Sequence, residues 1–123
     1  MTNVIIRLFH YVNICYMKVQ ANKIWHQKKE CEHVADIFKT ISHAERIAIL
    51  SYICECDKCT SRVKNIYEAL NLSQPNVSRH LSLMKKQNVV KRSCKGGDTF
   101  FTLNLENKIV SCIQSCLKEF KTQ

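Results

Sequence analysis

Residues 70–92 read LNLSQPNVSRHLSLMKKQNVVKR, and this stretch decides the fold. Asn71 suits the left-handed conformation that ends a helix, and Ser73 is a good N-cap for the helix that follows. Pro75 would lie in the first turn of that helix, where the N–H groups have no helical partner anyway. Apolar residues then recur at three- and four-residue spacing, at Val77, Leu81 and Met84. The stretch therefore predicts the end of one helix, a tight turn and a second helix.

More helices are predicted upstream of this turn. Apolar residues recur with helical spacing over residues 22–40. Ser42 and Glu45 have the spacing of a capping box. We therefore expect Ser42 to be the N-cap of a helix, with the Glu45 side chain reaching back to Ser42. The segment CECDKCTS, residues 54–61, then interrupts the apolar periodicity. One more short helix is expected between this segment and the turn.

Downstream of the turn the pattern changes to short strands. Residues 89–94 and 99–103 flank Lys-Gly-Gly-Asp, which is a hairpin turn signal. A last amphipathic helix is expected over residues 105–120. Two short helices followed by a basic hairpin form the order of a winged helix-turn-helix. The predicted fold is mainly α with a two-stranded β-hairpin, and its helices form the dimer interface.

The N-terminal residues fit this pattern poorly. We expect a DNA-binding and dimerisation domain over residues 22–121, preceded by an uncertain extension over residues 1–21. That extension is either an extra helix or a stretch upstream of the true start, because Met17 and Lys18 look like a more typical basic N-terminus. Both interpretations stay open, including whether residues 1–16 belong to the native protein.

Composition narrows the class of protein. The chain has 123 residues, a formal net charge of +9 and eight cysteines. The positive charge suits a polyanionic partner, most simply nucleic acid. With two glycines and one proline, the chain does not look like a loop-rich secreted disulfide scaffold. Arg7, His10 and Asn13 interrupt the apolar N-terminal run, so neither a leader nor a membrane span is expected. We expect a cytoplasmic protein with reduced thiols and no membrane partner.

The polar face of the second helix of the turn predicts contact with DNA. Gln74 and Asn76 can pair with adenine, and Arg79 can pair with guanine. His80 would either contact DNA or pack. Lysines and arginines after this helix extend a basic surface that binds phosphate without reading sequence. The predicted DNA-binding residues are Ser73, Gln74, Asn76, Ser78, Arg79, His80, Lys85, Arg92 and Lys95.

From about residue 35 to residue 120 the chain resembles the ArsR–SmtB family of bacterial metal-responsive repressors. The stretches that carry the resemblance are IFKTISHAERIAIL (37–50), residues 70–92, and GGDTFFTL (96–103). The resemblance implies a dimer whose first and last helices form the interface. It also implies repression in the apo state and release from the operator when an inducer binds.

The family's inducer sites carry over poorly. Its zinc ligands on the last helix would lie within residues 105–120, but that stretch has no histidine and Lys108 stands where a ligand would be expected. The resemblance therefore gives no zinc site there. Another group of the family carries Cys-x-Cys at positions that correspond to Arg62 and Lys64. The thiols of this chain come earlier, which departs from the family pattern.

Cys54, Cys56 and Cys59 still form a strong set of candidate ligands, and Cys31 could supply a fourth from either protomer. Soft thiolates select As(III), Cd, Pb or Zn. Thiol redox or persulfide chemistry remains the alternative, as does the interpretation that the cysteines are small buried apolar residues. Cys112 and Cys116 share one face of the last helix, where they are either functional or packed.

No nucleophile–base pair, phosphate-binding glycine loop or carboxylate dyad indicates an enzyme, and no small organic substrate is expected. The sequence predicts a homodimeric repressor that binds double-stranded operator DNA. A thiol-reactive inducer, trivalent arsenic or a soft divalent metal, would release it. The alternative is a redox- or persulfide-responsive regulator of the same fold.

Overall fold

The computed structural model describes most of the chain after its N-terminal part. The described residues are 4–8, 10 and 28–121. Internal contacts divide the chain into two units, Met1–Ala35 and Asp36–Gln123. In the first unit, residues 4–8 and 10 are helical. The predicted domain boundary between residues 21 and 22 lies outside the described residues.

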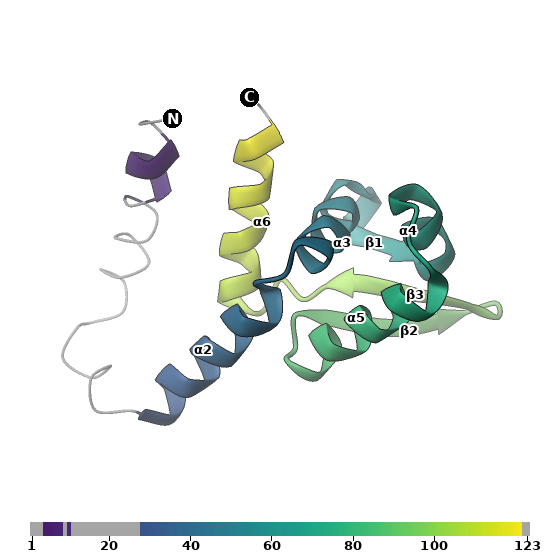
Figure 1. Ribbon diagram of the computed structural model, residues 1–123, viewed down its shortest axis with the longest axis horizontal. Coiled ribbons are helices and arrows are strands. Elements are labelled where there is room, and N and C mark those ends of the chain that lie inside the picture. Colours follow the sequence, from purple (N-terminus) through teal and green to yellow (C-terminus); the bar gives the residue numbers. More distant parts are fainter. Residues whose placement is uncertain (1–3, 9, 11–27, 122–123) are drawn as a thin grey trace. The chain divides into compact units, whose positions relative to one another are not determined.

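Helix α2 (Lys28–Ile41) ends in the second unit, which carries the remaining elements (Figure 1). These are α3 (Ala44–Glu55), η2 (Asp57–Cys59), β1 (Thr60–Arg62), α4 (Val63–Leu70), α5 (Gln74–Lys86), β2 (Val90–Lys95), β3 (Asp98–Leu103) and α6 (Lys108–Lys121). The mainly helical fold with a small antiparallel hairpin confirms the predicted class. None of the helices in the described part of the chain is long and apolar enough to cross a bilayer.

The turn between α4 and α5 forms as the sequence predicts. Asn71 adopts φ 53° and ψ 44°, the left-handed conformation that an asparagine tolerates better than most residues. The N–H of Leu72 then reaches back to the carbonyl of Tyr67 at 3.0 Å. Ser73 caps α5, since its Oγ accepts a hydrogen bond from the N–H of Asn76 at 3.3 Å. The two helices therefore form a helix-turn-helix, with Pro75 in the first turn of α5.

A second asparagine ends α5 in the same way. Asn88 has φ 58°, and the N–H of Val89 returns to the carbonyl of Met84 at 2.9 Å. This cap directs the chain into β2, whose first residue, Val90, is 1% exposed. Left-handed asparagines thus end both helices of the motif.

The start of α3 differs from the prediction. His43, not Ser42, is the N-cap, because His43 Nδ1 accepts a hydrogen bond from the N–H of Glu45 at 3.3 Å. The Glu45 carboxylate does not complete a capping box. It accepts hydrogen bonds from α5 instead, so a tertiary contact replaces the predicted local one.

The predicted hairpin is confirmed, and a third strand joins it. β2 and β3 pair antiparallel from Val90–Leu103 to Lys95–Asp98. Gly96 and Gly97 form the tip with φ of 59° and 83°, as a two-residue hairpin turn requires. β1, which the sequence did not predict, pairs with the other edge of β3, so the strand order is β1-β3-β2. Thr60 and Ser61 belong to β1, and Arg62 is the N-cap of α4.

One core holds α3 to α6 against the sheet. Val77 and Leu81 face inward from α5 as predicted and are fully buried. α6 begins at Lys108 rather than at residue 105, because Asn107 Oδ1 accepts a hydrogen bond from the N–H of Ile109 and caps it. The buried core residues are Ile37, Ile41, Ile49, Leu50, Ile53, Cys54, Ile66, Val77, Leu81, Met84, Val89, Val90, Phe101, Leu103 and Val110.

Candidate nucleic-acid interface and thiol segment

Most of the predicted DNA-binding residues lie on the surface. On and beside α5, the exposed ones are Ser73, Gln74, Ser78, Arg79 and Lys85. On β2, Arg92 and Lys95 are exposed as well. Because Val77 and Leu81 bury the opposite side of α5, this polar face is held outward by the core. The surface is thus polar on the helix and basic on the hairpin.

A groove of about 500 Å³ joins the helix to the hairpin. On one side it is lined by Gln74, Ser78, Ser82 and Lys85 of α5. On the other side it is lined by Arg92, Thr99 and Phe101 of the sheet, and Val63 of α4 closes it. Four residues that the sequence assigned separately to a helix and to a wing therefore face one hollow. The hydroxyl, amide and cationic groups along this groove can donate hydrogen bonds to phosphate oxygens and to base edges.

Asn76 is already engaged within the protein. Its Nδ2 donates to Glu45 Oε2 at 2.8 Å, and its Oδ1 accepts from Arg79 Nη2 at 2.6 Å. Asn76 is also only half-exposed. Each polar end of the amide that would pair with adenine thus already makes one hydrogen bond within the protein, whereas the guanidinium of Arg79 keeps most of its donors.

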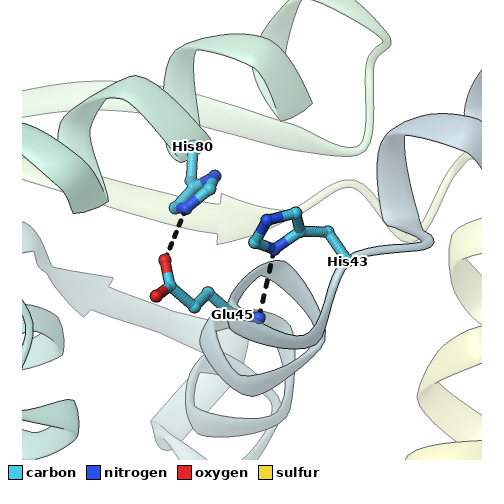
Figure 2. Close-up of side chains that lie close together, drawn as sticks. All are labelled: His43, Glu45 and His80. Carbon is cyan, nitrogen blue, oxygen red and sulfur yellow. Dashed lines mark hydrogen bonds and ion pairs between the residues drawn. The ribbon is translucent and has the colours of Figure 1, made fainter.

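His80 does not belong to the exposed face of α5, and of the two roles expected for it the structure shows packing against α3. The residue is 4% exposed. Its Nε2 donates to Glu45 Oε2 at 2.8 Å, and its Nδ1 accepts from Arg46 Nε at 3.1 Å. Arg46 in turn donates through Nη1 to the carbonyl of Thr40 at 2.8 Å. His80 therefore joins α5 to the start of α3 (Figure 2).

His43, Glu45 and His80 offer the one group of three ligand atoms in the described part of the chain that is compact enough for a metal ion, all within 4.8 Å of one another. Two imidazoles and a carboxylate are a donor set that zinc accepts. However, Arg46 Nε donates to His80 Nδ1, which places the ring proton on Nε2, the atom that faces Glu45. A metal ion bound there would have to displace this proton and lie beside a guanidinium cation. We therefore interpret the group as a polar contact between α3 and α5.

The Glu45 carboxylate is held in its charged form. The hydrogen bond from His80 contributes most, followed by that from Asn76, and together they keep the pKa of Glu45 below its ordinary value of 4.5. Burial acts in the opposite direction and does not reverse the shift. Glu45 is therefore an anionic anchor at neutral pH for two side chains of α5.

The cysteines of residues 54–59, here called the thiol segment, lie at the junction between α3 and β1. Cys54 is 8% exposed in the last turn of α3, and Cys56 and Cys59 are half-buried. Cys56 Sγ donates to the carbonyl of Tyr52 at 3.3 Å. In the described structure, the three sulfur atoms do not come as close together as the His43, Glu45 and His80 ligand atoms do. The donors fit a soft ion in kind, but they are not gathered into a finished site.

Two features single out Cys59. Its Sγ accepts a hydrogen bond from Gln114 Nε2 of α6 at 3.1 Å. Its own φ is 49°, and that of Lys58 is 52°, so two successive non-glycine residues adopt the left-handed conformation. The thiol segment is thus a strained turn tied directly to the last helix. Cys31 lies in the first unit.

The profile of the family described as "Bacterial regulatory protein, arsR family" matches residues 43–92, which span α3 to the first residues of β2. An HTH-type transcriptional regulator of Methanocaldococcus jannaschii is 33% identical over 70 residues, covering 57% of this chain and 76% of the relative. The chain belongs to the ArsR family. The transcriptional repressor SdpR of Bacillus subtilis is 32% identical over 69 residues, covering 56% of this chain and 73% of that protein.

Solved structures extend the likeness beyond the matched segment of this ArsR-family chain. HlyU of Vibrio cholerae superposes with a TM-score of 0.68 at 21% identity, covering 79% of this chain and all of HlyU. At that identity the likeness shows the fold alone. The profile and the relatives confirm the family expected from residues 37–50, 70–92 and 96–103, and the solved structures confirm the winged helix-turn-helix fold.

Sequence reasoning missed three residues that the structure of this ArsR-family protein makes prominent. Glu45 was assigned to a local cap, and Arg46 and Gln114 were given no role. A carboxylate and a guanidinium that open an otherwise apolar helix were the signal for Glu45 and Arg46. No comparable signal pointed to Gln114, because its partner is 55 positions away.

Proposed function

We propose that this ArsR-family protein is a transcriptional repressor that binds double-stranded operator DNA as a homodimer in the cytoplasm. The groove between α5 and the hairpin is the observation that carries the proposal. It puts the outward polar residues of α5 next to Lys85 and Arg92, so base contacts and phosphate contacts can be made together. The formal charge of +9 supports the same partner.

The last helix supports the dimer. Ile109, Ile113 and Leu117 are only partly buried against the core, and Phe120 is 57% exposed. A single small domain rarely leaves such a row of apolar residues uncovered. A symmetric contact through α6 would cover it and would set the separation of two α5 helices on a two-fold symmetric operator.

We further propose that a thiol-reactive inducer acts at the thiol segment. As(III), Cd(II), Pb(II) or Zn(II) would bind the thiolates of Cys54, Cys56 and Cys59. Because Cys59 Sγ accepts from Gln114, a ligand on that sulfur would break the bond to α6. Since α6 is the proposed dimer helix, the spacing of the two α5 helices would change.

Redox or persulfide sensing is the second candidate. Cys56 and Cys59 lie in one short turn and are accessible enough for an oxidant to reach them. Oxidation of a thiolate there would remove the same contact to Gln114 without any metal ion. The two candidates therefore share one switch and differ in the reagent.

The test starts with DNA. The reduced wild type is used to enrich duplexes from a random library, and its affinity for the enriched site is measured over a range of salt. We expect Lys95→Ala to weaken enriched and scrambled DNA about equally and to lower the salt slope by about 1. A wild type that enriches no sequence would contradict the proposed function.

The complex is then treated with arsenite, Cd(II), Pb(II) or Zn(II), and separately with persulfide or peroxide. We expect thiophilic ions to release the wild type and to leave the Cys54→Ser/Cys56→Ser and Cys56→Ser/Cys59→Ser proteins on DNA. The variant His43→Asn, which keeps a capping side chain but removes an imidazole, is the control and should respond like wild type. Release by oxidants alone would favour the second candidate, and full metal release of both thiol variants would exclude the thiol segment as the sensor.

A further inference from the structure

A chain of hydrogen bonds runs from the start of α3 to the exposed face of α5. Glu45 Oε2 accepts from Asn76 Nδ2 at 2.8 Å, and Asn76 Oδ1 accepts from Arg79 Nη2 at 2.6 Å. We propose that Glu45 is a positioning residue for DNA recognition, which fixes Asn76 so that Asn76 orients the guanidinium of Arg79 toward a base. This inference rests on the proposed function and deepens it, because it names how one base contact is set up.

The chemistry of the three groups permits only one arrangement. A carboxylate only accepts hydrogen bonds and a guanidinium only donates them, while an amide has one end of each kind. Glu45 therefore requires the Nδ2 end of Asn76, which turns Oδ1 toward Arg79. A flipped amide would put two acceptors together on one side and two donors together on the other. The orientation of Asn76 is thus imposed by α3, a helix outside the helix-turn-helix.

Glu45 is itself well fixed. The same oxygen, Oε2, accepts from the buried His80, whose other ring nitrogen accepts from Arg46. The backbone N–H of Glu45 donates to His43 Nδ1 (Figure 2). Without the contact with Glu45, the half-exposed Asn76 and the exposed Arg79 would sample several rotamers. The contact with Glu45 transmits the rigidity of the core to them.

Arg79 benefits most from this restraint. Its side chain is exposed, and a free arginine loses much rotamer freedom when it binds. One hydrogen of Nη2 is used by Asn76, and the remaining donors suffice for the two acceptors of a guanine edge. Asn76 has less reserve, since each end of its amide already makes one hydrogen bond and the side chain would have to keep both while it met adenine. The structure thus assigns base reading to Arg79 and positioning to Asn76 and Glu45.

The experiment compares affinity for the duplex enriched by the wild type with affinity for its scrambled version. Loss of Arg79 in Arg79→Ala should lower this ratio by roughly 5- to 150-fold, the range of one bidentate base contact. Glu45→Ala and Asn76→Ala should each lower it by about fivefold or more. Glu45→Gln should keep the ratio near that of wild type, because a single oxygen takes both hydrogen bonds and an amide also supplies one.

Two controls separate positioning from a loss of charge or of structure. Glu68→Ala removes a more exposed carboxylate from α4 and should leave the ratio unchanged. Asn76→Ala keeps the contact between Glu45 and His80, so it tests the chain of hydrogen bonds in a protein whose α3–α5 packing is intact. Thermal melting of each variant verifies the fold.

The decisive measurement is Glu45→Ala in an Arg79→Ala background. If Glu45 acts through Arg79, the second substitution adds no further loss of the ratio. An equal loss with and without Arg79 would overturn the inference, as would an Asn76→Ala protein with the wild-type ratio. A wild type that enriches no duplex would instead overturn the proposed function, which distinguishes the two failures.

Discussion

Gln114 Nε2 donates a hydrogen bond of 3.1 Å to Cys59 Sγ and thereby joins α6 to the turn after α3. The two residues are 55 positions apart in the chain. A thiol that can be bound or oxidised is therefore in direct contact with the helix that we propose as the dimer helix. A reagent that binds this sulfur competes with the glutamine for it.

Gln114→Ala tests whether this contact carries the inducer's effect. We expect the variant to bind operator DNA like wild type but to lose most of the release caused by Cd(II), because the ion still binds the thiols while α6 no longer responds. A coupling of about 1–3 kcal/mol, equal to a roughly 5- to 150-fold change in affinity, would be lost. Fluorescence anisotropy with and without Cd(II) measures it. Lys118→Ala, an exposed change on the same helix, should retain the response, and an unchanged response in Gln114→Ala would show that the coupling runs elsewhere.

Phe120→Asp tests the proposed dimer. Phe120 is 57% exposed in the single chain, so its loss should cost the fold of one subunit little, whereas a carboxylate buried at a dimer contact is strongly unfavourable. We expect light scattering to show a folded monomer of 14.3 kDa for this variant and a dimer for the wild type. Lys118→Gln, which changes the charge by the same single unit, should remain a dimer. If the wild type and Phe120→Asp form equally stable dimers, the interface lies away from Phe120.

The left-handed Asn71 makes a prediction for stability. An alanine at φ 53° brings its Cβ against the next carbonyl, so Asn71→Ala should lower the free energy of unfolding by about 1 kcal/mol. Asn71→Gly should be neutral or stabilising. Asn65, exposed inside α4, gives the control, because alanine there improves helix propensity. Urea unfolding should therefore show Asn71→Ala to be less stable than wild type and Asn65→Ala to be more stable. An Asn71→Ala protein as stable as wild type would contradict the importance of this cap.

The pKa of Glu45 makes a prediction for acid. Hydrogen bonds from His80 and Asn76 hold this pKa below 4.5, so the unfolded chain takes up the proton first as the pH falls. The stability that Glu45 contributes is thus fully present above its ordinary pKa and is lost as the pH falls below 4.5 through the folded value. Glu45→Gln cannot take up this proton and should show a flatter loss of stability at acid pH. Parallel curves of unfolding free energy against pH for the two proteins would refute the assignment.

The fold was predictable where it depends on local signals. Asn71, Pro75 and the two glycines of the hairpin tip act through their own backbone, and the Ser73 side chain acts on an N–H group only three positions away. β1 was not predictable, because three residues carry no periodicity and the strand exists only by pairing with β3. The cap of α3 was predicted one residue early, at Ser42 instead of His43, and the partners of the Glu45 carboxylate on another helix have no local signal.

The exposed part of the candidate site could also be predicted, since Gln74, Ser78 and Arg79 lie opposite the buried positions of one helix. Helical spacing predicts on which face of the helix a residue lies, but it does not predict the hydrogen-bond partner of its side chain. Asn76 and His80 share that helix, and only the packing of α3 against α5 shows that both are held by one carboxylate. The thiol segment was visible as a cluster in sequence, yet its contact with α6 was not.

The tip of the wing has a consequence for chemical design. A Cβ added at Gly96 or Gly97 would meet no atom within 4 Å, so bulk is not what excludes other residues there. What excludes them is the positive φ of both positions, which disfavours L-amino acids and suits their mirror images. In a chemically synthesised chain, D-alanine at either position should therefore preserve the hairpin, and a D-residue bearing a reporter group could extend into open solvent. At this point in the protein, chirality rather than volume decides which residues are tolerated.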